Sequence, residues 1–381
     1  MKDCQLTIPS VIYSGQGTSK KVAEIIQREQ AKSVLLFTGK DIRKNGLTKT
    51  VEEICQRVEL RVVDNLAAEP SVADVERTIQ AAGGKVDLII AIGGGSVMDA
   101  AKLASIIIGA DYTLQDLLQD SSCATKQMKT VMIPTTCGTG SEATCNAIVA
   151  IPELETKKGI VSDCMIPDYV LLDVDMIARL PAPILAATAV DALAHVVECY
   201  TSKKATVLSD TYALMGAQKI FHNIRKAYKD PEDLAAKLEL MVGAFYGGVA
   251  ITGSGTTAVH ALSYPLGGKY HIPHGVSNAI LFAHVMAFNK RGCAERLAQL
   301  CDVVYPQQAG TSVDERADYI IADIANVVQE TQIPVSLEKF GVKHEEIDFL
   351  VESGSQQTRL LVNNCLELSK ADIRSLYEKL F

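Results

Sequence analysis

The stretch DALAHVVECY, residues 191–200, places an aspartate and a histidine four residues apart in an otherwise apolar run. In a helix, residues at this spacing lie on the same face, so Asp191 and His195 could bind one metal ion together. The same line of the helix also carries Thr188 and Glu198. A polar line of this kind is equally typical of a solvent-exposed helix face. Spacing alone leaves both interpretations open, and by itself it favours solvent exposure.

The distribution of histidines favours the metal. All seven histidines of the chain come at or after position 195. The segment AVHALSYPLGGKYHIPHG contains His260, His271 and His274, and its prolines and glycines argue against one continuous helix. We therefore expect His260 to end one segment and His274 to open another. If the chain turns back there, both imidazoles could face the same cavity as Asp191 and His195.

Two glycine-containing loops in the first half of the chain predict a site for a pyrophosphate. The segment VDLIIAIGGGSVMDAAK is typical of a strand, a glycine turn and a helix, whose free N–H groups favour an anion. The segment PTTCGTGSEAT also follows an expected strand. Two such loops at the ends of strands in one sheet would converge where open α/β sheets bind ligands, although neither is the common GxGxxG motif. The candidate cofactor-binding residues in these loops are Gly94, Gly95, Ser96, Asp99, Thr135, Thr136 and Thr139.

The expected secondary structure divides the chain into two parts. In the first part, short apolar runs alternate with stretches of helical period; the runs are SVLLFTG, LRVVDN, VDLIIAIGGG, TVMIPTT and YVLLDVD. This alternation predicts a parallel sheet with helices on its faces. In the second part, helical stretches such as DLAAKLELMVGAFYGG prevail. We expect an α/β domain over residues 1–180 and an all-helical domain over residues 181–381.

Composition excludes several classes of protein. A net charge of −8 and the lack of a basic run argue against a nucleic-acid partner. The first ten residues lack the pattern of a signal peptide, and no apolar run approaches the length of a membrane span. Ten cysteines without paired CxxC spacing are typical of reduced thiols. We expect a soluble cytoplasmic protein with neither a nucleic acid nor a membrane as partner.

The motifs GGGSVMDAAK, PTTCGTGSEAT, DALAHVVECYTS and HALSYPLGGKYHIPHGVSNAI together resemble the iron-containing (group III) alcohol dehydrogenase family, over essentially the whole chain. The resemblance implies a dinucleotide-binding α/β domain of the dehydroquinate synthase-like type and an all-α domain, with a catalytic metal in the cleft between them. It implies that Asp191, His195, His260 and His274 bind the metal. The polar line would then face a metal and not solvent. Glu198 would be either a partner of a ligand or, as we favour, an ordinary helix residue.

Further site residues follow from the resemblance. Many family members carry another histidine four residues after the one at His260; here that position is Tyr264, whose hydroxyl could partly substitute for the imidazole. Asn146 resembles a family position at the edge of the active site. Lys158 matches a basic position beside the cofactor, although the alignment could slip by one residue to Lys157.

One position bears on the choice of cofactor. Relatives that prefer NAD tend to place an aspartate against the ribose 2′-hydroxyl, where this chain has Gly39 followed by Lys40. A carboxylate there would repel the 2′-phosphate of NADP, whereas glycine leaves room and the lysine attracts it. We expect NADP(H) to be accepted alongside NAD(H) or in preference to it.

The activity that the resemblance implies is hydride transfer between a nicotinamide and a small primary alcohol or aldehyde. Imidazole and carboxylate ligands suit Fe(II) and Zn(II) alike, and the family name favours iron. The alternatives are a glycerol dehydrogenase-like polyol dehydrogenase, a hydroxyacid–oxoacid transhydrogenase and a non-enzymatic nucleotide-binding protein. The third histidine, His195, favours the alcohol dehydrogenases, and the intact ligands and loops argue against a protein without activity. The family also implies a homodimer.

Overall fold

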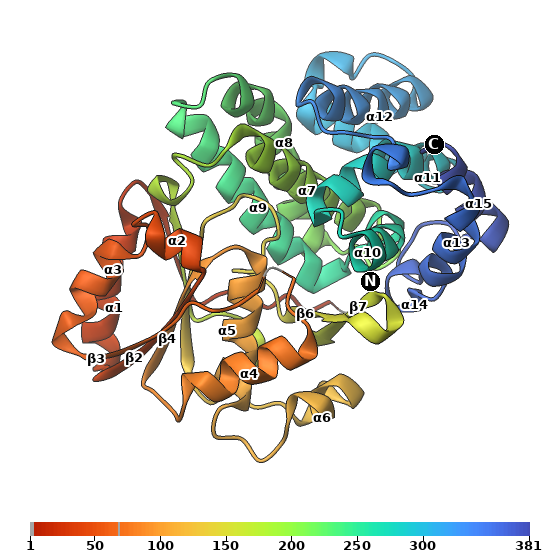
Figure 1. The fold of residues 1–381 in the computed structure, drawn as a ribbon. Coiled ribbons are helices and arrows are strands. Elements are labelled where there is room, and N and C mark those ends of the chain that lie inside the picture. Colours follow the sequence, from red (N-terminus) through yellow and green to blue (C-terminus); the bar gives the residue numbers. More distant parts are fainter. Residues whose placement is uncertain (1–3, 68) are drawn as a thin grey trace. The chain divides into compact units, whose positions relative to one another are not determined.

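The computed structural model describes residues 4–67 and 69–381, which form two compact units (Figure 1). One unit runs from Thr7 to Leu180, and the other comprises Pro181–Phe381 together with residues 4–6. The first unit contains a parallel sheet with helices, and the second is helical. The predicted fold class is therefore confirmed.

The α/β unit is built on a six-stranded sheet in which every pair of neighbouring strands is parallel. In spatial order its strands are β1 (Val11–Gly15), β8 (Tyr169–Asp173), β5 (Lys129–Pro134), β4 (Leu88–Gly93), β2 (Ser33–Thr38) and β3 (Glu59–Val63). The five runs that predicted strands account for all of them except β1. That strand lies at the sheet edge with every second residue exposed, so it lacks a long apolar run. An antiparallel hairpin of β6 (Asn146–Ile151) and β7 (Thr156–Val161) was also not predicted.

Helices cover both faces of this sheet. Successive residues of a strand point to opposite faces, and here the residues on both faces are apolar and buried. Leu36 and Ile90 pack in a core with α1 and α3, whereas Phe37 and Ile89 pack in a second core with α4 and α5. The helices of this unit are α1 (Val22–Glu29), α2 (Lys40–Lys44), α3 (Lys49–Ile54), α4 (Val72–Ala82), α5 (Gly95–Ile107) and α6 (Leu114–Gln119).

The helical unit contains α7 (Ala182–Thr201), α8 (Val207–Lys229), α9 (Leu234–Ser254), α10 (Ala258–Tyr270), α11 (His274–Val304), α12 (Val313–Glu330), α13 (Ile347–Ser355), α14 (Thr358–Leu361) and α15 (Lys370–Glu378). The chain does break between α10 and α11, and His274 opens the second helix as predicted. His260, however, is the third residue of α10 and does not end a segment. The reason is that α10 continues through the buried Pro265 as far as Tyr270, so packing outweighs the cost of a proline within the helix.

Two helices correct the expectation about apolar length. By length and composition, α7 and α9 are apolar enough to cross a membrane. Most of each apolar stretch is buried inside the protein, 78% for α7 and 61% for α9. In the sequence, scattered polar residues interrupt the apolar runs of both helices, so no single run looked long enough to span a membrane. This burial is typical of core helices.

Glycines allow α7, α8 and α9 to pack closely. A Cβ atom on Gly243 of α9 would lie 2.6 Å from Ile220 of α8, and one on Gly216 of α8 would lie 2.8 Å from Val196 of α7. A Cβ atom on Gly247 would lie 3.3 Å from the Cβ of His195. The small residues of α9 therefore let α7 sit deep in the unit, where its polar line is shielded from water.

Candidate functional site

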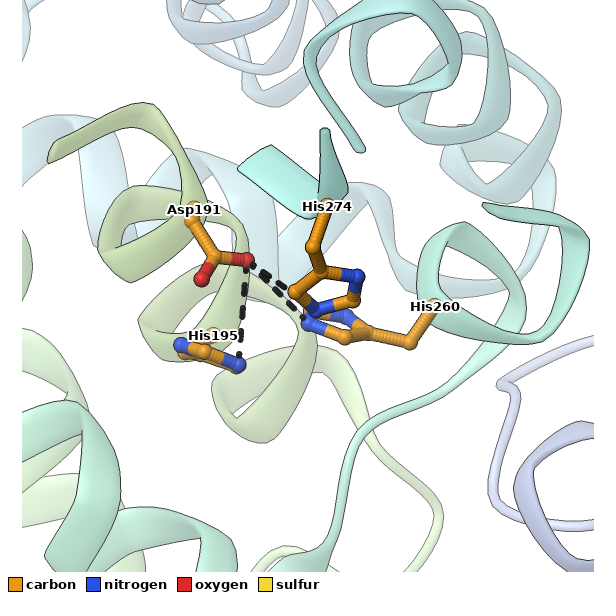
Figure 2. A group of neighbouring side chains, drawn as sticks. All are labelled: Asp191, His195, His260 and His274. Atoms are coloured by element: carbon orange, nitrogen blue, oxygen red, sulfur yellow. Dashed lines mark ion pairs between the residues drawn. The ribbon is translucent and has the colours of Figure 1, made fainter. Parts of the chain in front are cut away.

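Four side chains from three helices meet inside the helical unit (Figure 2). They are Asp191 and His195 of α7, His260 of α10 and His274 of α11, and one ligand atom of each lies within 4.8 Å of the others. The Asp191 Oδ1 atom lies 4.0 Å from His195 Nε2, 3.6 Å from His260 Nε2 and 3.5 Å from His274 Nε2. The first three residues are buried and His274 is partly exposed. The interpretation of Asp191 and His195 as part of a solvent-exposed helix face is therefore wrong.

The spacing of these atoms fits a divalent metal. Ligand atoms about 2.1 Å from a tetrahedral ion are separated from one another by about 3.4 Å. The distances from Asp191 Oδ1 to the three Nε2 atoms run from 3.5 to 4.0 Å, so a small contraction would complete the coordination. Three imidazoles and a carboxylate are ligands that zinc and ferrous iron both accept.

A glycine brings α11 to this cluster. Gly275 follows His274 directly, and a Cβ atom on it would lie 2.2 Å from the carbonyl oxygen of Ala187 and 3.4 Å from the Cβ of Asp191. Since the carbonyl belongs to the backbone of α7, no side-chain rotation could relieve that contact. The first turn of α11 can therefore approach α7 only because this residue has no side chain.

Glu198 is a partner of a candidate ligand, so our preference for an ordinary helix residue was wrong. Its side chain is fully buried, and its Oε2 atom makes a short hydrogen bond with Nδ1 of His260. Its Oε1 atom accepts from the backbone N–H and hydroxyl of Thr257 and from the N–H of Val259. The carboxylate therefore caps the N-terminus of α10 and orients His260. The sequence gives no sign of this because the partners lie about sixty residues further along the chain.

Asn278 is a second residue that the sequence did not reveal. It is fully buried on α11, and its Nδ2 atom donates to Asp191 Oδ1 at 2.7 Å. The same nitrogen lies 3.1 Å from His260 Nε2 and 3.3 Å from His274 Nε2. Its Oδ1 atom is buried without a hydrogen-bond partner among the described residues. The spacing of four residues after His274 is the one available signal, because it places both side chains on one face of α11.

The buried charges shift one another's pKa values. Burial would raise the pKa of Asp191, but the imidazoles of His195, His274 and His260 hold it well below its usual range. Burial would lower the pKa of His260, but the Glu198 carboxylate, together with Asp191, raises it to about 9. Burial would also raise the pKa of Glu198, yet the contact with His260 lowers it. Without a metal, a proton on His260 therefore offsets part of the negative charge of the two carboxylates.

Tyr264 lies in the wall of the same region. It is buried one turn after His260 on α10, and its ring centroid is 6.4 Å from that of His274. Its ring packs with Ala261 and Leu360. The structure therefore places Tyr264 beside the candidate ligands.

In the α/β unit, the two predicted loops lie side by side. Gly93 pairs with Pro134 at the ends of β4 and β5, and the N–H of Thr135 donates to the carbonyl of Gly93 at 3.0 Å. A Cβ atom on Gly94 would lie 3.6 Å from Thr136, and one on Gly95 would lie 2.8 Å from Thr139. The sheet therefore brings the two loops together at its carboxyl edge, where the glycines leave the backbone open.

Asp99 connects these loops from within the protein. Its carboxylate accepts from the hydroxyl of Ser141 and from the N–H of Ile148, and it lies 2.9 Å from the ammonium of Lys102. Lys102 is fully buried and also donates to the carbonyls of Ser141 and Asn146. Both oxygens of Asp99 are thus used inside the unit, which favours a structural role over direct contact with a cofactor. The side-chain Oδ1 atom of Asn146 is buried without a hydrogen-bond partner among the described residues.

The two neighbouring lysines of β7 point to opposite sides. Lys158 is exposed, and its ammonium donates to the carbonyl of Leu118. Lys157 is buried and pairs with Glu69 at 2.7 Å. The N–H of Glu69 donates to the hydroxyl of Ser96 in the glycine loop at 3.1 Å. The alternative alignment to Lys157 therefore agrees better with a basic residue near that loop.

Gly39 directly follows β2, at the start of α2. Its φ of −102° suits any residue, and a Cβ atom there would meet only the side chain of Ile42, at 3.4 Å. Lys40 is exposed beside it. An aspartate would therefore fit at position 39 without a change in the backbone.

The raised pKa of His260 predicts a stability that depends on pH in the metal-free protein. The folded value is about 9 against 6.5 for a free imidazole, so the protonated form stabilises the fold fully below pH 6.5. This contribution, on the order of 3 kcal/mol, is lost as the pH rises through 9. We expect the melting temperature in the presence of a chelator to fall between pH 6.5 and 9. The fall should shrink in His260→Gln and persist in the surface control His344→Gln; equal falls in all three proteins would contradict the assignment.

Two family profiles match the chain. "Iron-containing alcohol dehydrogenase" matches residues 9–174, and "Fe-containing alcohol dehydrogenase family, C-terminal" matches residues 185–381. The chain is 32% identical to Long-chain-alcohol dehydrogenase 1 of Geobacillus thermodenitrificans, an alignment that covers 100% of this chain and 98% of that protein. It is also 32% identical to 4-hydroxybutyrate dehydrogenase of Clostridium kluyveri, over 82% of this chain and 84% of the relative.

Solved structures agree with these sequence matches. A crystal structure of 1,3-propanediol oxidoreductase is similar with a TM-score of 0.94 and 27% identity, covering 100% of both chains. An iron-containing alcohol dehydrogenase of Thermotoga maritima is similar with a TM-score of 0.86 and 27% identity, covering 99% of both chains. The resemblance noted in the sequence is thus confirmed: the chain belongs to the iron-containing alcohol dehydrogenase family and is an oxidoreductase that acts on CH–OH groups.

Proposed function

We propose that this protein uses one divalent metal ion, bound by Asp191, His195, His260 and His274, to interconvert a small primary alcohol and its aldehyde with a nicotinamide cofactor. The observation that carries the proposal is the convergence of these four side chains, three of them buried. When bound, the ion supplies Lewis-acid stabilisation of the negative charge that develops on the substrate oxygen. The family name favours iron over zinc.

The protein's own contribution is to hold the imidazoles in the form that binds a metal. A histidine ligand needs a free lone pair on the nitrogen that faces the ion, so its proton must lie on the other nitrogen. In His260, Nδ1 donates to Glu198, which leaves Nε2 directed toward Asp191 and Asn278. The hydrogen bond from Asn278 to Asp191 Oδ1 orients the carboxylate in the same way.

The α/β unit supplies the cofactor site in this proposal. The open loops Gly93–Ser96 and Thr135–Ser141 offer backbone N–H groups to a pyrophosphate. The N-terminus of α5, which begins at Gly95, adds the positive end of its helix dipole. Gly94, Gly95, Ser96, Thr135, Thr136 and Thr139 are the contacts that we propose. Asp99 supports them, and a lysine of β7, Lys158 or its buried neighbour Lys157, adds a positive charge. Gly39 and Lys40 admit NADP(H) as well as NAD(H).

The remaining assignments rest on the family. Relatives are named for long-chain alcohols, 4-hydroxybutyrate and 1,3-propanediol, so the shared chemistry is a primary alcohol and its aldehyde. Tyr264 and Asn146 are the side chains that we propose to lie near the substrate. We further propose a cytoplasmic homodimer.

Removal and return of the metal tests the function. We expect reduction of short aldehydes by NADPH or NADH to be abolished by a chelator under anaerobic conditions and to return with one equivalent of Fe(II) or Zn(II). The ion supplies the Lewis acid of the proposed reaction, so the reaction should stop without it. Cofactor oxidation would be followed by absorbance. Activity that persists without metal would contradict the proposal, and turnover without free nicotinamide would indicate a transhydrogenase.

Substitution Glu198→Gln tests how the metal ligand is held. The glutamine carbonyl can still cap α10, but its NH2 group would face Nδ1 of His260 and force the proton onto Nε2. We expect the dissociation constant for Zn(II), measured by competition with a chromophoric chelator, to rise about 10- to 100-fold. The exposed control Glu295→Gln should bind as the wild type does. An unchanged dissociation constant in Glu198→Gln would refute this role of Glu198.

Substitution Gly39→Asp tests the cofactor assignment. The new carboxylate fits the backbone and would repel a 2′-phosphate while accepting the ribose hydroxyl of NAD. We expect the ratio of kcat/KM for NADPH to that for NADH to fall by about tenfold or more. Gly310→Asp, at a position with open space around it, controls for added charge. If the ratio does not move, position 39 does not face the ribose.

A further inference from the structure

A pair of cysteines far from the candidate ligands in sequence lies at the kink of α11. The helix contains one residue with non-helical angles, Cys293, at φ −145° and ψ 27°. The Cys293 thiol donates to the carbonyl of Asn289 at 3.2 Å, and the Cys365 thiol donates to the same oxygen at 3.6 Å. Two segments about seventy residues apart thus place two free thiols beside one carbonyl oxygen.

Neighbouring contacts hold these two segments together. The amides of Asn289 and Asn364 make a reciprocal pair, each donating to the other at 2.8 Å. Asn363 donates to the carbonyl of Thr256 at 2.9 Å, and its own carbonyl accepts from the N–H of Lys203. These contacts anchor the backbone close to both thiols.

The two sulfur atoms differ in character. The interaction between the two sulfurs raises the pKa of Cys293 and lowers that of Cys365, which also lies near the ammonium of Lys203. Cys365 is partly exposed, whereas Cys293 is buried. A partly exposed thiol of lowered pKa beside a second thiol is the arrangement in which oxidation of one sulfur is followed by formation of a disulfide.

We propose that Cys293 and Cys365 form a redox-active pair that hydrogen peroxide converts into a reversible intramolecular disulfide. The Cys365 sulfur attacks one peroxide oxygen, the O–O bond breaks, and the departing oxygen leaves as water. The Cys293 sulfur then attacks the Cys365 sulfur, the S–O bond breaks and a second water leaves. The two thiols thus lose two electrons and two protons, and hydrogen peroxide takes them up to form two molecules of water. This modification does not depend on the proposed function.

Peptide mapping after mild oxidation tests the pair. The reduced protein would be treated with stoichiometric hydrogen peroxide, alkylated, digested and analysed by mass spectrometry. We expect a peptide that links residues 293 and 365, reversible by dithiothreitol, and oxidation of Cys365 about tenfold faster than that of the exposed Cys123. The link should persist in Cys301→Ser, a buried cysteine on the same helix whose pKa burial raises to about 11.

The variants distinguish the two roles. Cys293→Ala should leave Cys365 as a sulfenic acid that a dimedone reagent labels, whereas Cys365→Ala should leave Cys293 unreacted. Thermal unfolding of both variants checks that they are folded, and the wild-type mapping stands even if one variant does not fold. Oxidation of Cys365 to a sulfinic acid in the wild type without any link to Cys293, or an unreactive pair, would overturn the proposal.

Discussion

The arrangement of the helical unit depends on the buried carboxylate of Asp191, which needs positive charge around it. Asp191 is almost completely removed from water in the middle of an apolar helix, where an isolated negative charge would cost several kcal/mol. Three imidazoles from three helices and the amide of Asn278 surround its Oδ1 atom. These groups meet because α7, α10 and α11 pack against one another at this point. The close approach at Gly275 and the capping of α10 by Glu198 are two parts of that arrangement.

The α/β unit solves a similar problem with a different pair. Lys102 is fully buried and would be as costly as Asp191 if it stood alone, but Asp99 and the carbonyls of Ser141 and Asn146 satisfy it. The same contacts fix the loop that follows β5 against the helix that follows β4. In both units, buried charges thus hold distant segments of the chain together.

Much of this arrangement could be predicted from the sequence, because its signals are local. The spacing of Asp191 and His195 indicates one helix face, and strand–glycine–helix patterns indicate the loops at the carboxyl edge of the sheet. Local patterns do not reveal which side of a helix faces the interior, so the polar line alone suggested solvent. Glu198 and Asn278 were missed or misjudged because their partners come from distant segments that only the fold brings near. The continuation of α10 through Pro265 likewise depends on packing, and the edge strand β1 has too few buried residues to give a pattern.

The central claim is that the four side chains bind one metal ion. Its most direct test is a crystal structure of the protein reconstituted with Fe(II) or Zn(II), with diffraction measured on both sides of the absorption edge of the metal. We expect a single strong anomalous peak about 2.0–2.2 Å from Asp191 Oδ1 and from the Nε2 atoms of His195, His260 and His274. An anomalous peak at another position, or a fully metal-loaded protein with no peak among these four residues, would contradict binding of the ion by these side chains.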